Sequence, residues 1–81
     1  TIIDEILFQR MDERVAGWLE AQAQYKGEIE VTHQEIADDL GSSREVISRI
    51  LEDFNQEGLI ETARGSIKII NIKGLKSRSA L

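Results

Sequence analysis

The chain has 81 residues, no cysteine and no proline, and its 15 acidic side chains outnumber 10 Lys and Arg to give a formal net charge of −5. A chain this short buries only about 60% of its extended surface on folding, which allows one small core and disfavours an enzyme with a deep cleft. The lack of cysteine excludes disulfides, thiolate zinc sites and a cysteine nucleophile. The apolar runs are too short to cross a bilayer. As an average, the acidic charge argues against a nucleic-acid partner.

The charge is distributed unevenly along the chain. Residues 1–62 carry all 15 acids and five bases, a net charge of −10, whereas residues 63–81 carry five bases and no acid, a net charge of +5. Such an asymmetry is more informative than the total, because it leaves one segment suited to an anionic partner.

Residues 2–25 are predicted to form a helix, because apolar side chains recur there at spacings of three and four residues. Gly27 follows as a natural stop, since glycine adopts the left-handed conformation that commonly ends a helix. We expect a bend near residues 9–12, where Asp12 is suited to cap a new turn. Trp18 lies on the apolar face and is expected in the core.

Residues 28–31 alternate polar and apolar side chains, which predicts a short strand. Thr32 and Glu35 have the spacing of a capping box, in which each side chain bonds the backbone of the other residue. A helix should therefore span residues 33–40. Gly41 should end it in the left-handed conformation.

A second, longer helix is predicted next, with Ser42 and Glu45 at capping-box spacing and Gly58 at its end. Two helices joined by three residues that include a glycine are typical of a helix-turn-helix. The apolar stripe that locks the second helix onto the first consists of Val46, Ile47, Ile50, Leu51 and Phe54.

Residues 59–62 and 66–72 are predicted to be strands joined by a hairpin turn at Ala63-Arg64-Gly65. The predicted fold class is therefore mainly α with a small β-hairpin, a winged helix-turn-helix. Residues 74–81 are interpreted as a basic, flexible tail.

Four side chains of the second helix project away from its apolar stripe: Arg44, Glu45, Ser48 and Arg49. They occupy the turns that enter the major groove in helix-turn-helix proteins. Arginine can bond O6 and N7 of guanine, glutamate can accept from the N4 amine of cytosine, and serine can bond either kind of base edge. These four residues are the predicted base readers.

A second set of residues surrounds this face and is predicted to contact DNA phosphates. The helix that follows Thr32 offers free backbone N–H groups at a positive dipole end, and the hairpin supplies cations. The set consists of Thr32, His33, Gln34, Ser42, Ser43, Arg64 and Lys68. His33 has no partner at metal-ligand spacing, so no metal site is expected.

The segments Thr32–Ala37 and Leu40–Leu51 resemble the DNA-binding domain of the Crp/Fnr family of bacterial transcription regulators. The similarity spans roughly Arg10–Ile72, and the string Leu-Gly-x-Ser-Arg-Glu-x-x-x-Arg is its most specific part. Family base readers correspond to the four side chains named above. The Crp-branch pattern and the Fnr-branch pattern are both satisfied, so the half-site stays open.

The resemblance also implies a domain organisation. Residues 1–10 would be the end of a dimerisation helix or linker, residues 11–73 the winged domain, and residues 74–81 the tail. No cofactor is expected in this chain. An effector, a cyclic nucleotide or another ligand, would bind a preceding domain, and the isolated chain should dimerise weakly or not at all.

The predicted function is sequence-specific DNA binding by a cytoplasmic, non-enzymatic transcription regulator. The helix at 43–57 would enter the major groove and the wing at 60–72 would contact the backbone of an inverted-repeat operator bound by a homodimer. The resemblance also implies RNA polymerase as a partner, through the acidic surface formed by Asp38, Asp39, Glu28 and Glu30. The alternative for this surface is that it only keeps the domain soluble. The alternative is a winged-helix protein-interaction module without specific DNA binding, but a docking helix would more often show apolar anchors.

Overall fold

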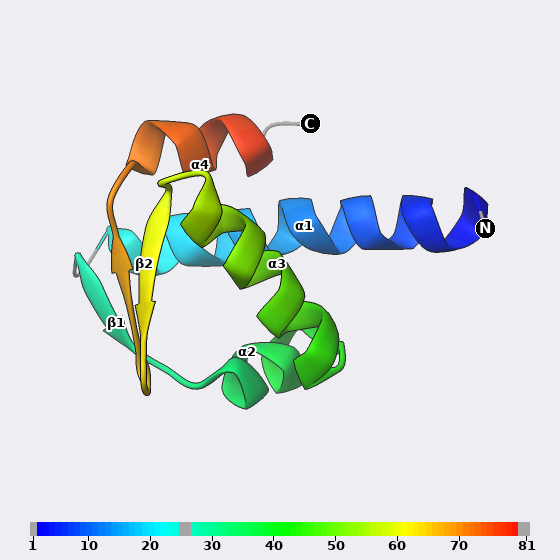
Figure 1. The fold of residues 1–81 in the computed structure, drawn as a ribbon, viewed down its shortest axis with the longest axis horizontal. Helices are drawn as coiled ribbons and strands as arrows, with labels where there is room; N and C mark the ends of the chain where they lie inside the picture. The colour runs from blue at the N-terminus through cyan, green and yellow to red at the C-terminus, as the bar shows by residue number, and fades with distance from the viewer. Residues whose placement is uncertain (1, 25–26, 80–81) are drawn as a thin grey trace.

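A computed structural model describes the backbone of residues 2–24 and 27–79, and the side chains of residues 11–24 and 27–79 (Figure 1). Four helices and three strands follow one another along the chain. They are α1 (Ile2–Ala23), β1 (Glu28–Glu30), α2 (His33–Leu40), α3 (Arg44–Gln56), β2 (Ile60–Ala63), β3 (Ser66–Ile69) and α4 (Ile72–Ser79).

Helix α1 continues as one straight helix through residues 9–12, so the predicted bend there is wrong (Figure 1). Its first turns extend past the other elements, and its second half packs on the core. Trp18 is only half-buried, and its indole N–H donates to Asp39 Oδ2 at 2.6 Å. This bond ties α1 to the C-terminal end of α2.

The strands form one antiparallel sheet in the order β1-β3-β2. The predicted hairpin is confirmed, with Ala63 paired to Ser66 across a turn made by Arg64 and Gly65. The predicted end of its second strand and of the wing at residue 72 is wrong, because β3 ends at Ile69 and Ile72 already begins α4. Gly65 has a φ of 74°, a conformation that glycine adopts without strain. The strand β1 pairs with β3, so the wing is a three-stranded sheet rather than an isolated hairpin.

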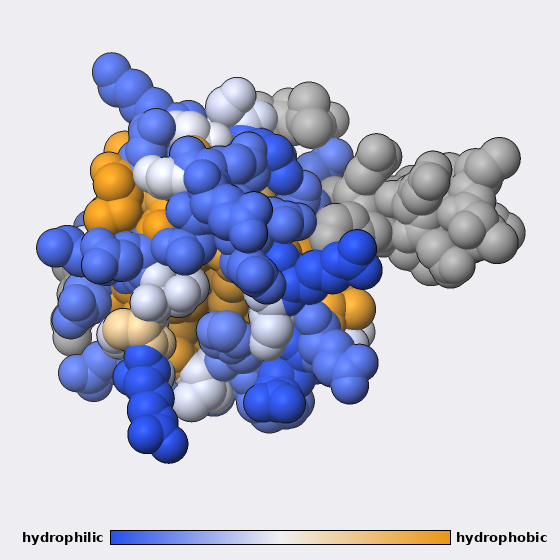
Figure 2. Space-filling model, viewed as in Figure 1, coloured by the Kyte–Doolittle hydropathy of each residue, from blue (hydrophilic) through white to orange (hydrophobic). Residues whose placement is uncertain are grey.

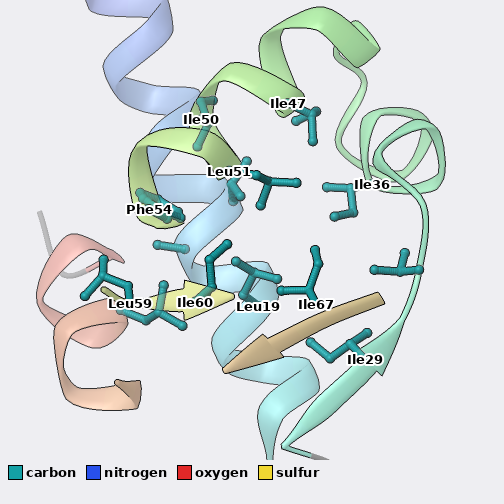
Figure 3. Packing of buried hydrophobic residues seen from close by; sticks show 14 of the residues in the cluster. Leu19, Ile29, Ile36, Ile47, Ile50, Leu51, Phe54, Leu59, Ile60 and Ile67 are labelled. Carbon is teal, nitrogen blue, oxygen red and sulfur yellow. The ribbon is translucent and has the colours of Figure 1, made fainter. Parts of the chain in front are cut away.

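Every element contributes to one apolar core, and no polar side chain among the described residues is fully buried. Figure 3 shows side chains from α1, α2, α3 and the sheet pointing into the same interior. The buried residues are Val15, Ala16, Leu19, Ile29, Val31, Ile36, Ala37, Ile47, Ile50, Leu51, Phe54, Leu59, Ile60, Ile67 and Leu75.

The predicted flexible tail is wrong over residues 74–79, which belong to α4; residues 80–81 lie outside the described part of the chain. Asn71 Oδ1 accepts from the backbone N–H of Gly74 at 3.0 Å, as an N-cap does. Leu75 is completely buried and fixes α4 against the core. The Asn71 cap, the buried Leu75 and the ion pairs of Arg78 therefore order a segment whose composition is polar and basic.

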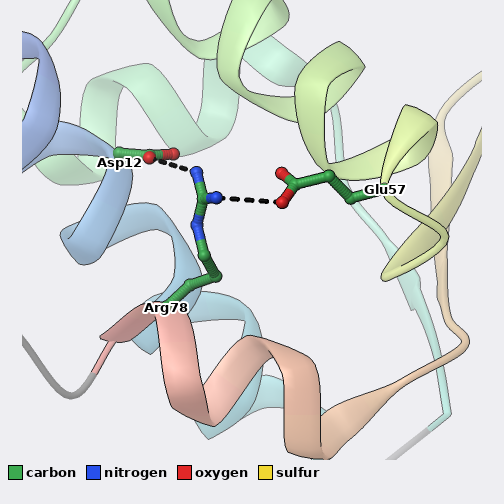
Figure 4. A network of polar contacts seen from close by, with 3 residues as sticks. All are labelled: Asp12, Glu57 and Arg78. Carbon is green, nitrogen blue, oxygen red and sulfur yellow. Dashed lines mark hydrogen bonds and ion pairs between the residues drawn. The ribbon is translucent and has the colours of Figure 1, made fainter.

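Arg78 joins α4 to two other helices (Figure 4). Its guanidinium donates to Asp12 of α1 at 2.5 Å and to Glu57, at the end of α3, at 2.9 Å. The same guanidinium lies 5.3 Å from the centre of the Phe54 ring. Because Asp12 is the more buried of the two acids, its ion pair is the less screened by solvent.

We expect opposite effects from two glycine-to-alanine substitutions in the helices. At Gly74 a Cβ would overlap the Leu59 side chain, so Gly74→Ala should lower the free energy of unfolding by about 1–3 kcal/mol. At Gly17 a Cβ would meet Ser79 Cβ at an ordinary 3.8 Å. Gly17→Ala should therefore raise the free energy of unfolding by up to about 1 kcal/mol, because alanine has the higher helix propensity. Urea denaturation checks both, and a Gly74→Ala variant as stable as wild type would contradict the close packing of α4.

Candidate nucleic-acid interface

Helix α2 begins and ends where the sequence predicts. Thr32 Oγ1 accepts from the Glu35 N–H at 3.1 Å, and Glu35 Oε1 accepts from the Thr32 N–H at 3.1 Å, which confirms the capping box. Gly41 ends the helix with a φ of 69°. Local hydrogen bonds thus fix the start of α2, where the backbone N–H groups of the first turn have no partners within the helix.

The cap of α3 differs from the prediction by one residue. Ser43, not Ser42, is the N-cap, and its hydroxyl accepts from the Val46 N–H at 3.3 Å. The reason is that the Ser42 N–H donates to Ala37 O at 2.8 Å, so Ser42 still belongs to the turn that closes α2. Ser42 is half-buried, whereas Ser43 is exposed.

The predicted base readers lie together on the first two turns of α3. Arg44, Glu45 and Arg49 are exposed, and Ser48 is half-buried. The opposite face of α3 is packed into the core, so the four side chains have a fixed helix beneath them. In Figure 1 this end of α3 lies beside α2 and away from α4.

A hydrogen bond connects the two predicted contact sets. His33 Nδ1 and Ser48 Oγ lie 2.7 Å apart, between the first residue of α2 and the second turn of α3. Partial burial lowers the pKa of His33, and the positive charge of Arg44 lowers it further. The sequence predicts His33 only as a phosphate contact, because nothing local signals the helix crossing that brings Ser48 to it.

Gln34, the next residue of α2, is exposed, and its side-chain amide donates to Asp38 Oδ1 at 2.8 Å. That bond spans one helical turn on the surface of α2. It leaves the remaining amide hydrogen of Gln34 available to a phosphate oxygen.

The two wing cations occupy different surroundings. Arg64 is exposed in the hairpin turn, and the neighbouring Gly65 O accepts from the Val31 N–H at 3.1 Å, which holds the wing tip beside the start of α2. Lys68 lies further along β3, directly opposite Glu28 on one side and Glu61 on the other. Residues opposite one another in a sheet share a face, so Lys68 is flanked by acids.

Large exposed apolar side chains are absent from α2 and α3. Within the described part of the chain they are Ile70 and Ile72, where β3 leads into α4. Figure 2 shows hydrophilic side chains over most of the visible surface, with an orange patch on the side where β3 meets α4. The described residues contain no group of acids and histidines that could hold a metal ion, and no helix among them is both long and apolar enough to cross a membrane.

A family model described as a Crp-like helix-turn-helix domain matches residues 13–78. The match covers most of the chain, from the second half of α1 to the last turn of α4. The chain belongs to the Crp/Fnr family of transcription regulators. It is therefore a DNA-binding, bacterial-type regulatory domain of the helix-turn-helix class.

Relatives of this Crp/Fnr domain agree with the assignment. The transcriptional regulator SdrP of Thermus thermophilus is 30% identical over 82 aligned residues, which cover 91% of this chain and 41% of the relative. A crystal structure classed as a Crp/Fnr-family regulator from Eubacterium rectale is 40% identical, with a TM-score of 0.83 over 98% of this chain and 38% of that one. The Thermus thermophilus catabolite activator protein is 25% identical, with a TM-score of 0.88 over 96% of this chain and 38% of that one. The chain thus spans about two fifths of the length of these relatives.

The family match also bears on α4. It extends to residue 78 and so includes most of α4, the helix whose polar, basic composition led to the prediction of a flexible tail.

His33 should make the fold less stable in mild acid. Its pKa in the folded chain lies below the ordinary value of 6.5, so between those two values the unfolded chain binds more protons than the folded chain. The contribution of His33 to the free energy of unfolding is complete above pH 6.5 and is lost as the pH falls toward the lowered pKa. Urea denaturation between about pH 7 and about pH 5.5 should show a smaller loss of stability in His33→Gln than in wild type. Equal losses would contradict the lowered pKa.

Proposed function

We propose that this domain binds double-stranded DNA in a sequence-specific manner, with the first two turns of α3 in the major groove. The observation that carries the proposal is the exposed group Arg44, Glu45 and Arg49 on a helix end fixed by the Ser43 cap and a buried opposite face. In helix-turn-helix proteins this end of the second helix meets the base edges.

The three charged side chains suit a G·C-containing site. Arg44 and Arg49 would each donate two hydrogen bonds to O6 and N7 of a guanine, and Glu45 would accept from the N4 amine of a cytosine. A carboxylate near DNA is repelled by phosphates, so a base contact that offsets this repulsion is the role that best explains Glu45. Ser48 completes the reading face at the second turn of α3.

The flanking polar groups would hold the phosphate backbone. Thr32, His33 and Gln34 lie at the start of α2, where free N–H groups and the helix dipole favour an anion. Ser42 and Ser43 flank the start of α3, and Arg64 stands at the wing tip. Lys68 would be the weaker wing contact, because its position between Glu28 and Glu61 reduces the attraction for a phosphate.

In the whole protein, two copies of this domain would bind an inverted repeat, with half-sites about 34 Å apart so that both α3 helices enter successive major grooves. An effector bound to another domain would control the distance between the two copies. The acidic surface that includes Asp38 is the candidate contact for RNA polymerase, although Asp38 and Asp39 are also bonded within the fold. The lack of large exposed apolar side chains on α3, within the described residues, favours DNA over a protein docked on this helix.

Arg49→Ala should relax the preference at one base position of the site. Loss of a bidentate contact to guanine removes about 1–3 kcal/mol of discrimination at that position and leaves the others unchanged. Selection from random duplexes, followed by titration of singly substituted sites, measures this. The same selected sequence for Arg49→Ala and wild type would exclude Arg49 as a base reader.

Arg64→Ala should instead weaken binding to all duplexes alike. Loss of one phosphate contact should flatten the dependence of log K on log salt by about 0.9. Lys68→Ala should change this slope less, because acids flank Lys68. Lys76→Ala on α4 is the matched control, which removes one positive charge far from the wing tip (Figure 1). An equal change in slope for Arg64→Ala and Lys76→Ala would contradict a local phosphate contact.

A further inference from the structure

We propose that His33 determines whether the Ser48 hydroxyl donates or accepts a hydrogen bond when it contacts a base. Nδ1 of His33 accepts the Ser48 hydroxyl hydrogen, so Ser48 can only accept in the groove. It therefore selects bases that carry an amine. The inference rests on the proposed function, since it concerns the same reading face. It makes His33 a positioning residue for specificity, in addition to its place among the phosphate contacts.

The contact is specific and built from two elements. His33 begins α2 and Ser48 lies on the second turn of α3, yet Nδ1 and Oγ are 2.7 Å apart. That separation is within the hydrogen-bonding range for either donor, so the direction of the bond depends on the protonation of the ring. Both side chains are half-buried, which limits the competition from water.

The charge state of the ring decides which atom donates. Burial and the nearby Arg44 lower the pKa of His33, so the imidazole is neutral near pH 7. A neutral imidazole has one N–H donor and one acceptor nitrogen. The Nε2–H form is the more stable neutral form in water, and it leaves Nδ1 as the acceptor. The bond then requires that Ser48 donates.

The number of hydrogen-bond donors and acceptors on a hydroxyl group limits how Ser48 can contact a base. A serine hydroxyl has one hydrogen and two lone pairs, and the hydrogen normally rotates to suit its partner. With that hydrogen held by His33, only lone pairs remain for the groove. In the major groove adenine and cytosine present amines, whereas guanine and thymine present carbonyl oxygens. Ser48 would therefore favour adenine or cytosine on the strand that it contacts.

Fixing the hydroxyl before binding also reduces the ordering that binding requires, because Ser48 already has its hydrogen-bonded rotamer in the free protein. His33 thus acts on specificity through Ser48, without needing a base contact of its own.

The test compares base preference in matched variants. His33→Phe keeps a ring of similar size and removes the acceptor, whereas His33→Asn places an amide oxygen near the position of Nδ1. Wild type should prefer adenine or cytosine at the Ser48 position by about threefold to tenfold, the range of one neutral hydrogen bond. His33→Phe should lose this preference, and His33→Asn should retain part of it. In a Ser48→Ala background, His33→Phe should change no base preference.

Two outcomes overturn the inference alone. One is a preference at the Ser48 position that is the same in His33→Phe and wild type, while affinity for all duplexes falls alike, as loss of a phosphate contact predicts. The other is an imidazole ¹⁵N spectrum of the free chain in which Nδ1 carries the proton. A wild-type chain with no base preference at any position would instead overturn the proposed function and the inference with it. Circular dichroism of each variant confirms that the fold is retained.

Discussion

The apolar contact between α2 and α3 is the constraint on which the remaining structure depends. Ile36 and Ala37 are completely buried against the Ile47 face of α3, and Gly41 allows the chain to turn between the two helices within three residues. Because Ala37 has a small side chain, the helices can cross closely. That crossing fixes the angle at which Arg44 leaves the surface, and it brings the start of α2 to the second turn of α3. The proposed reading face and the start of α2 are therefore held together by one packed contact.

The positions of the charged residues in the fold matter more for DNA binding than the net charge of the chain. The basic segment 63–81 does not form a single DNA-facing surface, because Arg78 is held by Asp12 and Glu57 in the fold. These acids are likewise part of the structure and add little to an exposed acidic field. Among the described residues, three acids remain in the wing sheet: Glu28 and Glu61 flank Lys68, and Glu30 lies opposite Ser66. The formal charge of −5 is thus compatible with a DNA-facing end that carries its own cations.

Local rules predict the helix-turn-helix well and the rest of the fold less well. Thr32, Glu35 and Gly41 act through bonds to near neighbours, so the sequence defines α2 to the residue. Two adjacent serines both have cap-like spacing before α3, and the choice of Ser43 depends on how α2 closes. The order of α4 depends on Leu75 reaching a core made by distant residues, and the pairing of β1 with β3 is equally long-range. For the candidate site, the sequence predicts which residue types lie on α3 and which face of the helix they share. It does not predict the His33–Ser48 bond, which is a product of tertiary packing.

In the proposed complex with DNA, affinity and specificity would come from different parts of this surface. Salt-dependent affinity grows with the number of cations that meet phosphates, and the wing offers Arg64 with a weaker Lys68. With so few phosphate-facing cations, the domain would bind non-specific DNA weakly, and discrimination among sequences would then have to come from base contacts. Under that condition the direction of a single hydrogen bond at Ser48 would matter more than it would on a strongly basic domain. A neutral, partly buried His33 would suit this purpose, because it would orient a proposed base-reading side chain without adding a positive charge to the DNA-facing surface.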